Sequence, residues 1–190
     1  MRPAVIIVDM VKDNLKPEYS ISAQVRNVLP SVQRLITMAR TRTYPVIFAC
    51  DSFLPDDFIF QGKMKPHSIQ GTEGAEIMDE LAPGPADLVL PKRRFSAFFG
   101  TGLTETLRGW GVDTLLIAGV ATHVCVLMTA MDGICHDFRV ILLKDCCASY
   151  RPDIHDSTIR MYERSPLEPL FRVLALEDFL AIEERAVTHP

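Results

Sequence analysis

Short apolar runs recur along the chain and are separated by amphipathic or irregular stretches. Each run has four to six residues, is rich in Val, Ile and Leu, and is mostly apolar throughout rather than alternating between apolar and polar positions. Such runs are typical of strands that are covered on both faces in a parallel sheet. The predicted strands are residues 4–8, 45–50, 87–90, 114–118, 140–143 and 171–174.

Helical patterns occupy most of the stretches between these runs. A helix is predicted at 28–42, with Pro30 in its first turn, where proline is tolerated. The alternation of strands and helices predicts an α/β fold, namely a three-layer α/β/α, doubly wound (Rossmann-like) arrangement with a six-stranded parallel sheet, in a single domain of 1–190. The other predicted helices are 104–110, a segment from about Cys125 to Gly133, 154–164 and 176–184.

Two segments lack these patterns and are predicted as loops. Residues 13–21 contain a turn around Pro17, and residues 52–85 are long and carry several Gly and Pro residues. A short helix at 75–81 is predicted inside the second segment. Loops of this length in compact domains are usually functional or mobile, so we expect residues 52–85 to contribute to substrate specificity.

Composition and charge narrow the class of protein. The chain has 190 residues with a net charge of −4, and it therefore lacks the basic character of a nucleic-acid-binding protein. No apolar run approaches the length of a membrane span, and the run at 4–8 is too short for a signal peptide. The five cysteines include no CxxC pair. We therefore expect a cytoplasmic protein with reduced thiols that binds neither nucleic acid nor membranes.

Polar residues follow four of the predicted strands. Asp9 and Asp51 end the first two strands, Lys92 comes just after the third, and Cys125 follows the fourth. The carboxyl ends of parallel strands lie at one edge of the sheet, and ligands bind at this edge in open α/β folds. These four side chains are therefore expected to lie close together.

Cys125 lies where a predicted strand gives way to a predicted helix. Unpaired backbone N–H groups and the positive end of the helix dipole favour an anion at such a position. The thiol is therefore expected to lose its proton more readily than a free cysteine. The alternative is a small buried residue at a helix start, because free cysteine packs well in protein cores.

Asp9 and Lys92 supply the groups that a thiol nucleophile needs. A carboxylate beside the thiol can accept its proton and later deliver it to a leaving amine, and an ammonium group favours the thiolate. Backbone N–H groups at the turn can stabilise an oxyanion, so the set suffices for amide hydrolysis through a covalent intermediate. Taken singly, Asp9 could instead cap a loop or helix, and Lys92 could be a solvated residue beside Arg93 and Arg94.

Three motifs strengthen this interpretation: Val8-Asp9-Met10, Lys92-(x)3-Ser96-Ala97-Phe98, and Gly119-Val120-Ala121-Thr122-His123-Val124-Cys125. Together they resemble the isochorismatase-like cysteine hydrolases, a superfamily that includes nicotinamidases and N-carbamoylsarcosine amidohydrolase. The resemblance extends from about residue 4 to residue 184, and the third motif is the most specific. It implies that Asp9, Lys92 and Cys125 form the catalytic triad.

The same resemblance implies several other properties. The Val120–Ala121 peptide bond is expected to be cis, and the backbone N–H groups of Ala121 and Cys125 are expected to form the oxyanion hole. The implied reaction is cleavage of a C–N bond in a small amide or carbamoyl compound through a thioester of Cys125, with no cofactor. The resemblance also implies a homo-oligomer with active sites near the subunit interface.

One position departs from the nicotinamidase pattern. Nicotinamidases hold a divalent metal with an Asp-x-His pair and a later His. Asp51 and His67 match two of these ligands, but Phe53 stands at the position of the middle His. Phenylalanine cannot bind a metal, and zinc usually has at least three protein ligands. We therefore expect no tight metal site, with Asp51 and His67 as vestiges of one.

Four residues are candidates for the wall of a substrate pocket, although core packing is the alternative for each phenylalanine. His67 is expected to contact substrate in place of a metal, with packing within the loop as the alternative. His123 is expected at the pocket mouth rather than as a base for the thiol. Phe58 and Phe95 are weaker candidates. The four are Phe53, His67, Phe98 and His123.

Two other functions remain open at this stage. An isochorismatase-type vinyl-ether hydrolase would use Asp9 as an acid and would need no thiol. A non-catalytic ligand-binding or thiol redox protein on the same scaffold would have a Cys125 that titrates like a free thiol.

Overall fold

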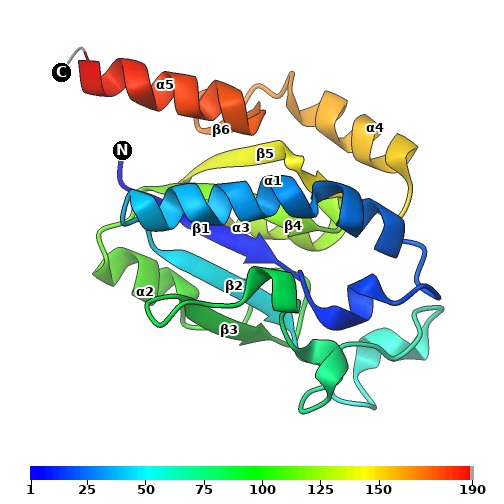
Figure 1. Cartoon of the computed structure of the whole chain (residues 1–190). Coiled ribbons are helices and arrows are strands. Elements are labelled where there is room, and N and C mark those ends of the chain that lie inside the picture. The colour runs from blue at the N-terminus through cyan, green and yellow to red at the C-terminus, as the bar shows by residue number, and fades with distance from the viewer. Residues whose placement is uncertain (189–190) are drawn as a thin grey trace.

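The computed structural model describes residues 1–188, with side chains described through residue 185. Six strands form one sheet in which every pair of neighbours is parallel, in the order β3-β2-β1-β4-β5-β6 (Figure 1). The strands are β1 (Pro3–Val8), β2 (Val46–Asp51), β3 (Leu88–Lys92), β4 (Thr114–Val120), β5 (Arg139–Ala148) and β6 (Phe171–Leu174).

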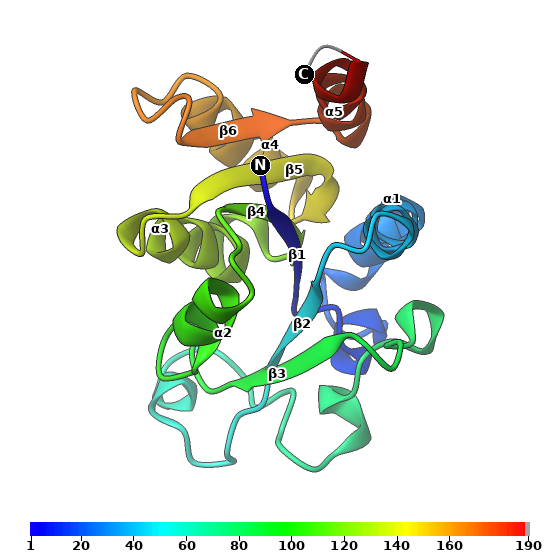
Figure 2. The same ribbon diagram turned by 90° about the vertical axis from the view of Figure 1, so that its left-hand side faces the viewer.

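Helices cover both faces of this sheet. One face carries α1 (Ser22–Thr41) and α5 (Leu176–Thr188), which contribute to one cluster of buried apolar residues. The other face carries α2 (Leu103–Gly109), α3 (Leu127–Cys135) and α4 (Pro152–Tyr162), which contribute to a second cluster. Figure 2 shows α1 and α5 on one side of the strands and α2 and α3 on the other. The predicted three-layer α/β/α fold is confirmed.

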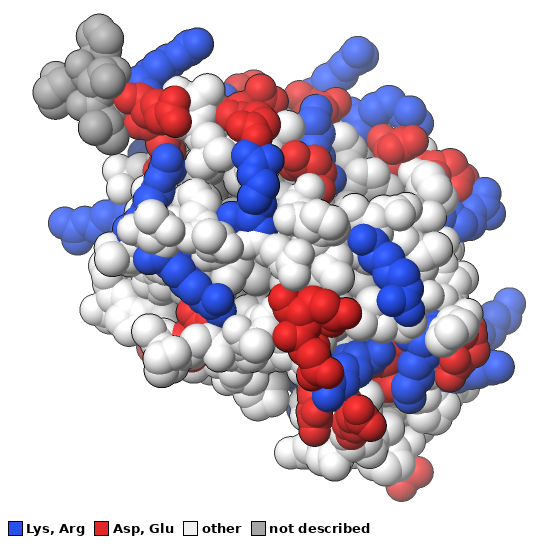
Figure 3. Space-filling model, viewed as in Figure 1, with Lys and Arg blue, Asp and Glu red and all other residues white. Residues whose placement is uncertain are grey.

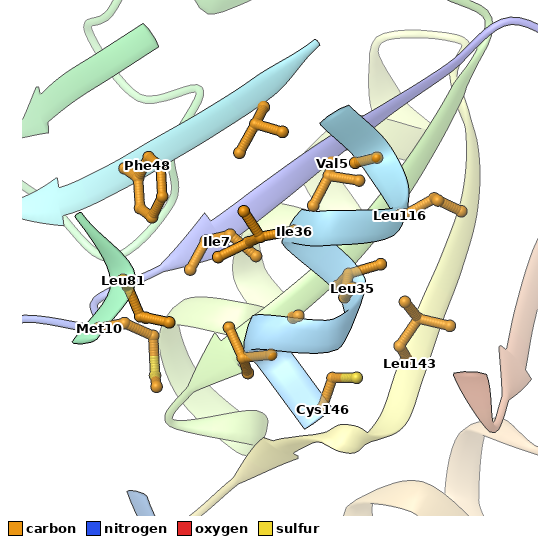
Figure 4. Packing of buried hydrophobic residues seen from close by; sticks show 14 of the residues in the cluster. Val5, Ile7, Met10, Leu35, Ile36, Phe48, Leu81, Leu116, Leu143 and Cys146 are labelled. Atoms are coloured by element: carbon orange, nitrogen blue, oxygen red, sulfur yellow. The ribbon is translucent and has the colours of Figure 1, made fainter. Parts of the chain in front are cut away.

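Side chains of the central strand β1 alternate between the two clusters. Val5 and Ile7 pack toward α1, where they meet Leu35 and Ile36 (Figure 4). The alternate residues of β1, Ala4, Ile6 and Val8, belong to the cluster on the opposite face. Burial of each such side chain contributes about 1.5–3 kcal/mol to stability. The continuous apolar run at the N-terminus therefore follows from burial of β1 on both faces.

The first helix is longer than predicted. It begins at Ser22 rather than near residue 28, and Pro30 lies in its interior instead of its first turn. The apolar stripe extends back to Val25, which is fully buried in the core. Packing of this additional turn outweighs the cost of about 3 kcal/mol that an interior proline imposes on a helix.

Two other predictions from the sequence are wrong, one about residues 75–81 and one about the length of the fifth strand. Residues 75–81 form separate 3₁₀ turns, Glu73–Ala75 and Asp79–Leu81, rather than one helix. The N–H group of Met78 between them donates to the carbonyl of Met10, so this backbone pairs with the end of β1 instead of with itself. Strand β5 also continues to Ala148, past the predicted end at residue 143.

Charged side chains of both signs are interspersed on the face of the molecule shown in Figure 3. Lys12 is an example, because its ammonium group lies among the carboxylates of Glu73, Glu76 and Asp79. Within the described part of the chain, none of the helices combines the length and the apolar character that crossing a bilayer requires.

Candidate active site

The candidate site lies at the carboxyl ends of β1 and β4. Strand β1 has β2 on one side and β4 on the other, so the strand order reverses between β1 and β4. A crevice forms outside the strand ends at such a reversal, and ligands of open α/β folds bind there. Asp9 directly follows β1, and Cys125 lies in the turn of π-helix, Thr122–Val126, that follows β4.

Gly119 allows these two segments to approach each other closely. It pairs with Val8 across the β1–β4 ladder and has a φ of +113°. A Cβ atom at this position would overlap the backbone oxygen of Val8. Only glycine fits such a conformation and such a contact. Asp9, which follows Val8, also has a positive φ of +51°, a region that Asp tolerates better than most residues.

Asp9, Lys92 and Cys125 are brought together as the sequence predicts. The Nζ atom of Lys92 lies 2.8 Å from Oδ2 of Asp9 and forms a second ion pair with Asp51. Ligand atoms of Asp9, Asp51 and Cys125 all lie within 4.8 Å of one another. Lys92, Asp9 and Cys125 are 0%, 2% and 7% exposed. The reacting groups are therefore shielded from bulk water.

The two oxygens of Asp9 have different surroundings. Oδ1 accepts the backbone N–H of Asp51 at 2.7 Å, which fixes the orientation of the carboxylate. Oδ2 contacts the Lys92 ammonium group but accepts no well-aligned hydrogen bond within the described residues. A buried carboxylate oxygen with a free lone pair beside a thiol is suited to accept a proton.

The Cys125 thiol is neutral before substrate binds, contrary to the sequence-based expectation. Burial, followed by the negative charge of Asp9, raises the pKa of Cys125 well above its ordinary value, and Lys92 only partly opposes this shift. The start of a helix favours a thiolate at solvent-exposed positions, but desolvation dominates here. To act as a nucleophile, this thiol would therefore need a nearby base to accept its proton.

Burial also shifts the two groups that flank Asp9. Desolvation and the Asp9 carboxylate raise the pKa of Asp51 to about 8. Desolvation disfavours the charge on Lys92, but Asp9, Cys125 and Asp51 outweigh it and raise the pKa of the ammonium group. Lys92 therefore stays charged, and the cluster carries no net positive charge.

A cavity of about 250 Å³ opens beside these groups. His67 and His123 line it, in agreement with the sequence analysis, and so do Ala121 and Cys125, whose N–H groups are the candidates for an oxyanion hole. The Val120–Ala121 peptide bond is cis. The remaining lining residues are Asp9, Asn14, Tyr19, Ser20, Ile21, Asp51, Met64, Phe95, Val120, Val124 and Tyr150.

Two predicted lining residues do not reach the cavity. Phe53 is fully buried, with its ring edge-on to His67 at 5.5 Å between ring centroids. Phe98 belongs to the core on the α3 face and stacks on Phe138 at 6.1 Å. The sequence analysis also missed Asn14 and Tyr19, although the position of segment 13–21 directly after the first strand was a usable signal.

A buried carboxylate holds the long loop 52–85 against the rest of the site. Asp13 accepts the backbone N–H of Ser68 at 2.6 Å, and the carbonyl of Ser68 accepts the N–H of Phe53 at 3.0 Å. In Figure 1 this loop, cyan to green, lies beside the blue segment that follows β1. These bonds fix the backbone on both sides of Ser68 and so place His67 in the cavity wall.

Comparison with known proteins gives the family. The model of the isochorismatase domain matches residues 3–171. The chain belongs to the isochorismatase family. This confirms the resemblance inferred from the three motifs, and the shared fold is that of a family of hydrolases.

Relatives within the isochorismatase family include amidohydrolases. Maleamate amidohydrolase of Pseudomonas putida is 26% identical over 167 residues, covering 83% of this chain and 78% of that protein. A probable inactive nicotinamidase of Arabidopsis thaliana is 34% identical, covering 82% and 85%. The crystal structure of N-carbamoylsarcosine amidase from Thermoplasma acidophilum is 31% identical, with a TM-score of 0.76, covering 92% and 96%.

The residues of this isochorismatase-family protein do not fit the metal site of nicotinamidases. Phe53 packs edge-on between Phe60 and His67 at the position of the middle ligand. Nδ1 of His67 contacts the carbonyl of Lys65 at 2.9 Å, and Asp51 is paired with the Lys92 ammonium group. Of the three positions that hold the metal in nicotinamidases, only Asp51 and His67 therefore offer a ligand atom, fewer than the three protein ligands that zinc usually has.

Proposed function

We propose that the protein is a cysteine amidohydrolase that cleaves the C–N bond of a small amide or carbamoyl compound. The observation that carries the proposal is the position of the Oδ2 atom of Asp9, which is buried beside the Lys92 ammonium group and the Cys125 thiol and accepts no aligned hydrogen bond from the described residues. The names of the Pseudomonas and Thermoplasma relatives, an amidohydrolase and an amidase, support the same reaction class.

In the first half of the reaction, the Cys125 sulfur attacks the amide carbon while Asp9 Oδ2 takes the thiol proton. The carbonyl electron pair moves onto oxygen, and the N–H groups of Ala121 and Cys125 stabilise this oxyanion. The oxyanion then collapses, the C–N bond breaks, and Asp9 gives its proton to the leaving nitrogen. The products are an amine or ammonia and a thioester of Cys125.

In the second half, water attacks the thioester while Asp9 takes a proton from the water. The C–S bond breaks, the thiolate of Cys125 recovers the proton, and a carboxylic acid leaves. Lys92 stays charged throughout and offsets the negative charge that passes between Asp9 and Cys125. Each step uses groups that are already in contact, so no large movement of the site is needed.

A panel of small amides tests the proposal by ammonia release. We expect Cys125→Ala to lose activity by at least about a thousandfold, and Asp9→Asn by at least about a hundredfold, while both variants keep the far-UV spectrum of the parent. Mass spectrometry of acid-quenched enzyme should detect an acyl adduct on the peptide that contains Cys125. Cys135→Ala, an exposed cysteine on α3, is the matched control and should retain full activity.

Two results would overturn the proposal. Amide turnover that persists in Cys125→Ala would exclude a thioester. Cleavage of a vinyl ether that survives Cys125→Ala but is lost in Asp9→Ala would instead indicate an isochorismatase-type reaction. The panel is repeated with a chelator, and because Phe53 stands at the position of the middle metal ligand of nicotinamidases, we expect turnover that the chelator does not change.

A further inference from the structure

We infer that the cavity selects amides whose remaining part carries no negative charge. The inference rests on the proposed function and specifies its substrate class. It is drawn from the charged groups around the cavity, the hydrogen bonds of the two histidines in its wall, and the aromatic side chains that complete it.

The cavity wall contains no lysine or arginine within the described part of the chain. The nearest ammonium group is that of Lys92, which is fully buried behind the wall and already paired with Asp9 and Asp51. Arg94 lines an adjoining groove, and its guanidinium group contacts the Asp57 carboxylate at 3.3 Å. A substrate carboxylate would therefore lose its hydration and gain no cationic partner.

Hydrogen bonding in the wall sets the tautomer of His67. A backbone carbonyl can only accept, so the contact from Nδ1 to the Lys65 carbonyl places the proton of a neutral ring on Nδ1. Nε2 is then a hydrogen-bond acceptor. The rings of Tyr19, Phe53 and Phe60 surround His67 and hold it in place. An acceptor at this position favours an N–H or O–H group of a substrate and repels a carboxylate.

The second histidine of the wall, His123, carries no positive charge near pH 7. Burial lowers its pKa, so the ring is neutral near pH 7. Its Nδ1 atom lies 2.8 Å from the hydroxyl of Ser149, and its ring packs edge-on against Tyr150 at 5.0 Å between centroids. The His123 imidazole therefore does not compensate for the absence of a lysine or arginine in the wall.

Apolar and aromatic groups form much of the remaining wall, including Tyr19, Ile21, Met64, Phe95 and Tyr150. These groups stabilise an uncharged substituent by excluding water from it. They cannot replace the hydration shell of a carboxylate. The wall thus fits compounds such as simple aliphatic or aromatic primary amides better than amides that also carry an acid.

Matched pairs of primary amides test this inference directly. Succinamate carries a carboxylate where butanamide carries a methyl group. Maleamate differs from (Z)-but-2-enamide in the same way. We expect the uncharged member of each pair to have a kcat/KM at least about tenfold higher near pH ~7.5. Equal or higher values for the acids would overturn the inference and leave the amidohydrolase proposal intact.

Binding to the Cys125→Ala variant, measured by calorimetry with the same four compounds, gives a readout that does not depend on turnover. Tighter binding of the uncharged members supports the inference even if no amide is hydrolysed, an outcome that would end the proposed function alone. Tighter binding of the acids overturns the inference. An acid preference that disappears in Arg94→Gln would also overturn it and assign carboxylate binding to the adjoining groove.

A charge added to the wall provides a second test. Met64 is 39% exposed at the edge of the cavity, so its replacement leaves the core intact. Met64→Arg is expected to raise kcat/KM for succinamate relative to butanamide by about tenfold, because the guanidinium group can pair with the carboxylate. Met64→Gln is the uncharged control and should leave the ratio unchanged. A ratio that Met64→Arg leaves unchanged would contradict the inference that this wall disfavours acids because it offers them no cationic partner.

Discussion

The Nζ atom of Lys92 lies 2.8 Å from Oδ2 of Asp9, and the side chains are only 0% and 3% exposed. Asp51 pairs with the same ammonium group from the adjacent strand, in register with Lys92. Each of these charges would be costly to bury alone, but together they compensate one another. The site therefore depends on Lys92 for its stability as well as for its electrostatics.

Replacing Lys92 should destabilise the protein strongly. Lys92→Met leaves the Asp9 carboxylate buried beside Asp51 without a cation, so we expect the free energy of unfolding to fall by about 3–5 kcal/mol. Urea denaturation measures this loss. Lys144→Met, which removes a half-exposed ion pair with Glu163, is the control and should cost less than about 1 kcal/mol. Similar losses in the two variants would contradict this account of the cluster.

Removing the charge of Asp9 should change thiol reactivity and turnover in opposite directions. After burial, Asp9 is the largest cause of the raised pKa of Cys125. Asp9→Asn should therefore speed alkylation of Cys125 by iodoacetamide near pH ~7.5, although the same change removes the catalytic base. Peptide mass spectrometry over time measures the rate, with exposed Cys135 as the internal control. Slower alkylation together with lost turnover would indicate a misplaced thiol instead.

Asp51 should impose a pH dependence on stability. Its pKa is raised from 3.8 to about 8, so the folded state holds a proton that the unfolded state has lost. The resulting stabilisation is complete below the pKa of Asp51 in the unfolded state, 3.8, and decreases as the pH rises toward the folded-state pKa of about 8. The asparagine side chain in Asp51→Asn does not titrate. The free energy of unfolding of this variant should therefore decline less steeply between pH 3.8 and about 8. Parallel profiles for the two proteins in urea titrations would argue against a protonated Asp51.

The contact between Gly119 and Val8 should tolerate no side chain. Gly119→Ala places a Cβ atom against the Val8 backbone and forces an L-residue into a φ of +113°. We expect a loss of about 3 kcal/mol or more, or failure to fold. Gly109→Ala, at the open end of α2, is the control and should be neutral or stabilising by up to about 1 kcal/mol. Circular dichroism during thermal unfolding compares the three proteins.

The apolar runs predicted the parallel sheet because strands buried on both faces are visible in sequence. Asp9, Asp51 and Cys125 could be placed at one edge for the same reason, since Asp9 and Asp51 directly follow their runs and Cys125 lies in the turn after the fourth run. The start of α1 could not be predicted in the same way. Pro30 suggested a first turn, whereas the contact of Val25 with the core, which depends on tertiary packing, decides where the helix begins.

The chemistry of the site was harder to predict than its location. The ionisation of Cys125 depends on how deeply the surrounding loops bury it, and a local argument from the helix start gave the wrong direction. The sequence alone does not distinguish a phenylalanine that lines a pocket from one that packs in the core, and tertiary packing directs Phe53 and Phe98 into the interior. Tyr150 follows the fifth strand, whose continuation to Ala148 the sequence pattern did not reveal.

The residues around the cavity come from two kinds of structural element, and this bears on how substrate selectivity can change among related proteins. Asp9, Asp51 and Lys92 lie at or next to the ends of sheet strands, whereas Tyr19, Met64 and His67 come from two connecting segments outside the sheet. Exchanging those segments between family members would transplant the choice of substrate and leave the reactive groups undisturbed. Under the proposed function, recognition and reactivity would therefore be separable, and chimaeras that exchange the stretch 52–85 between family members would test this by their substrate selectivity.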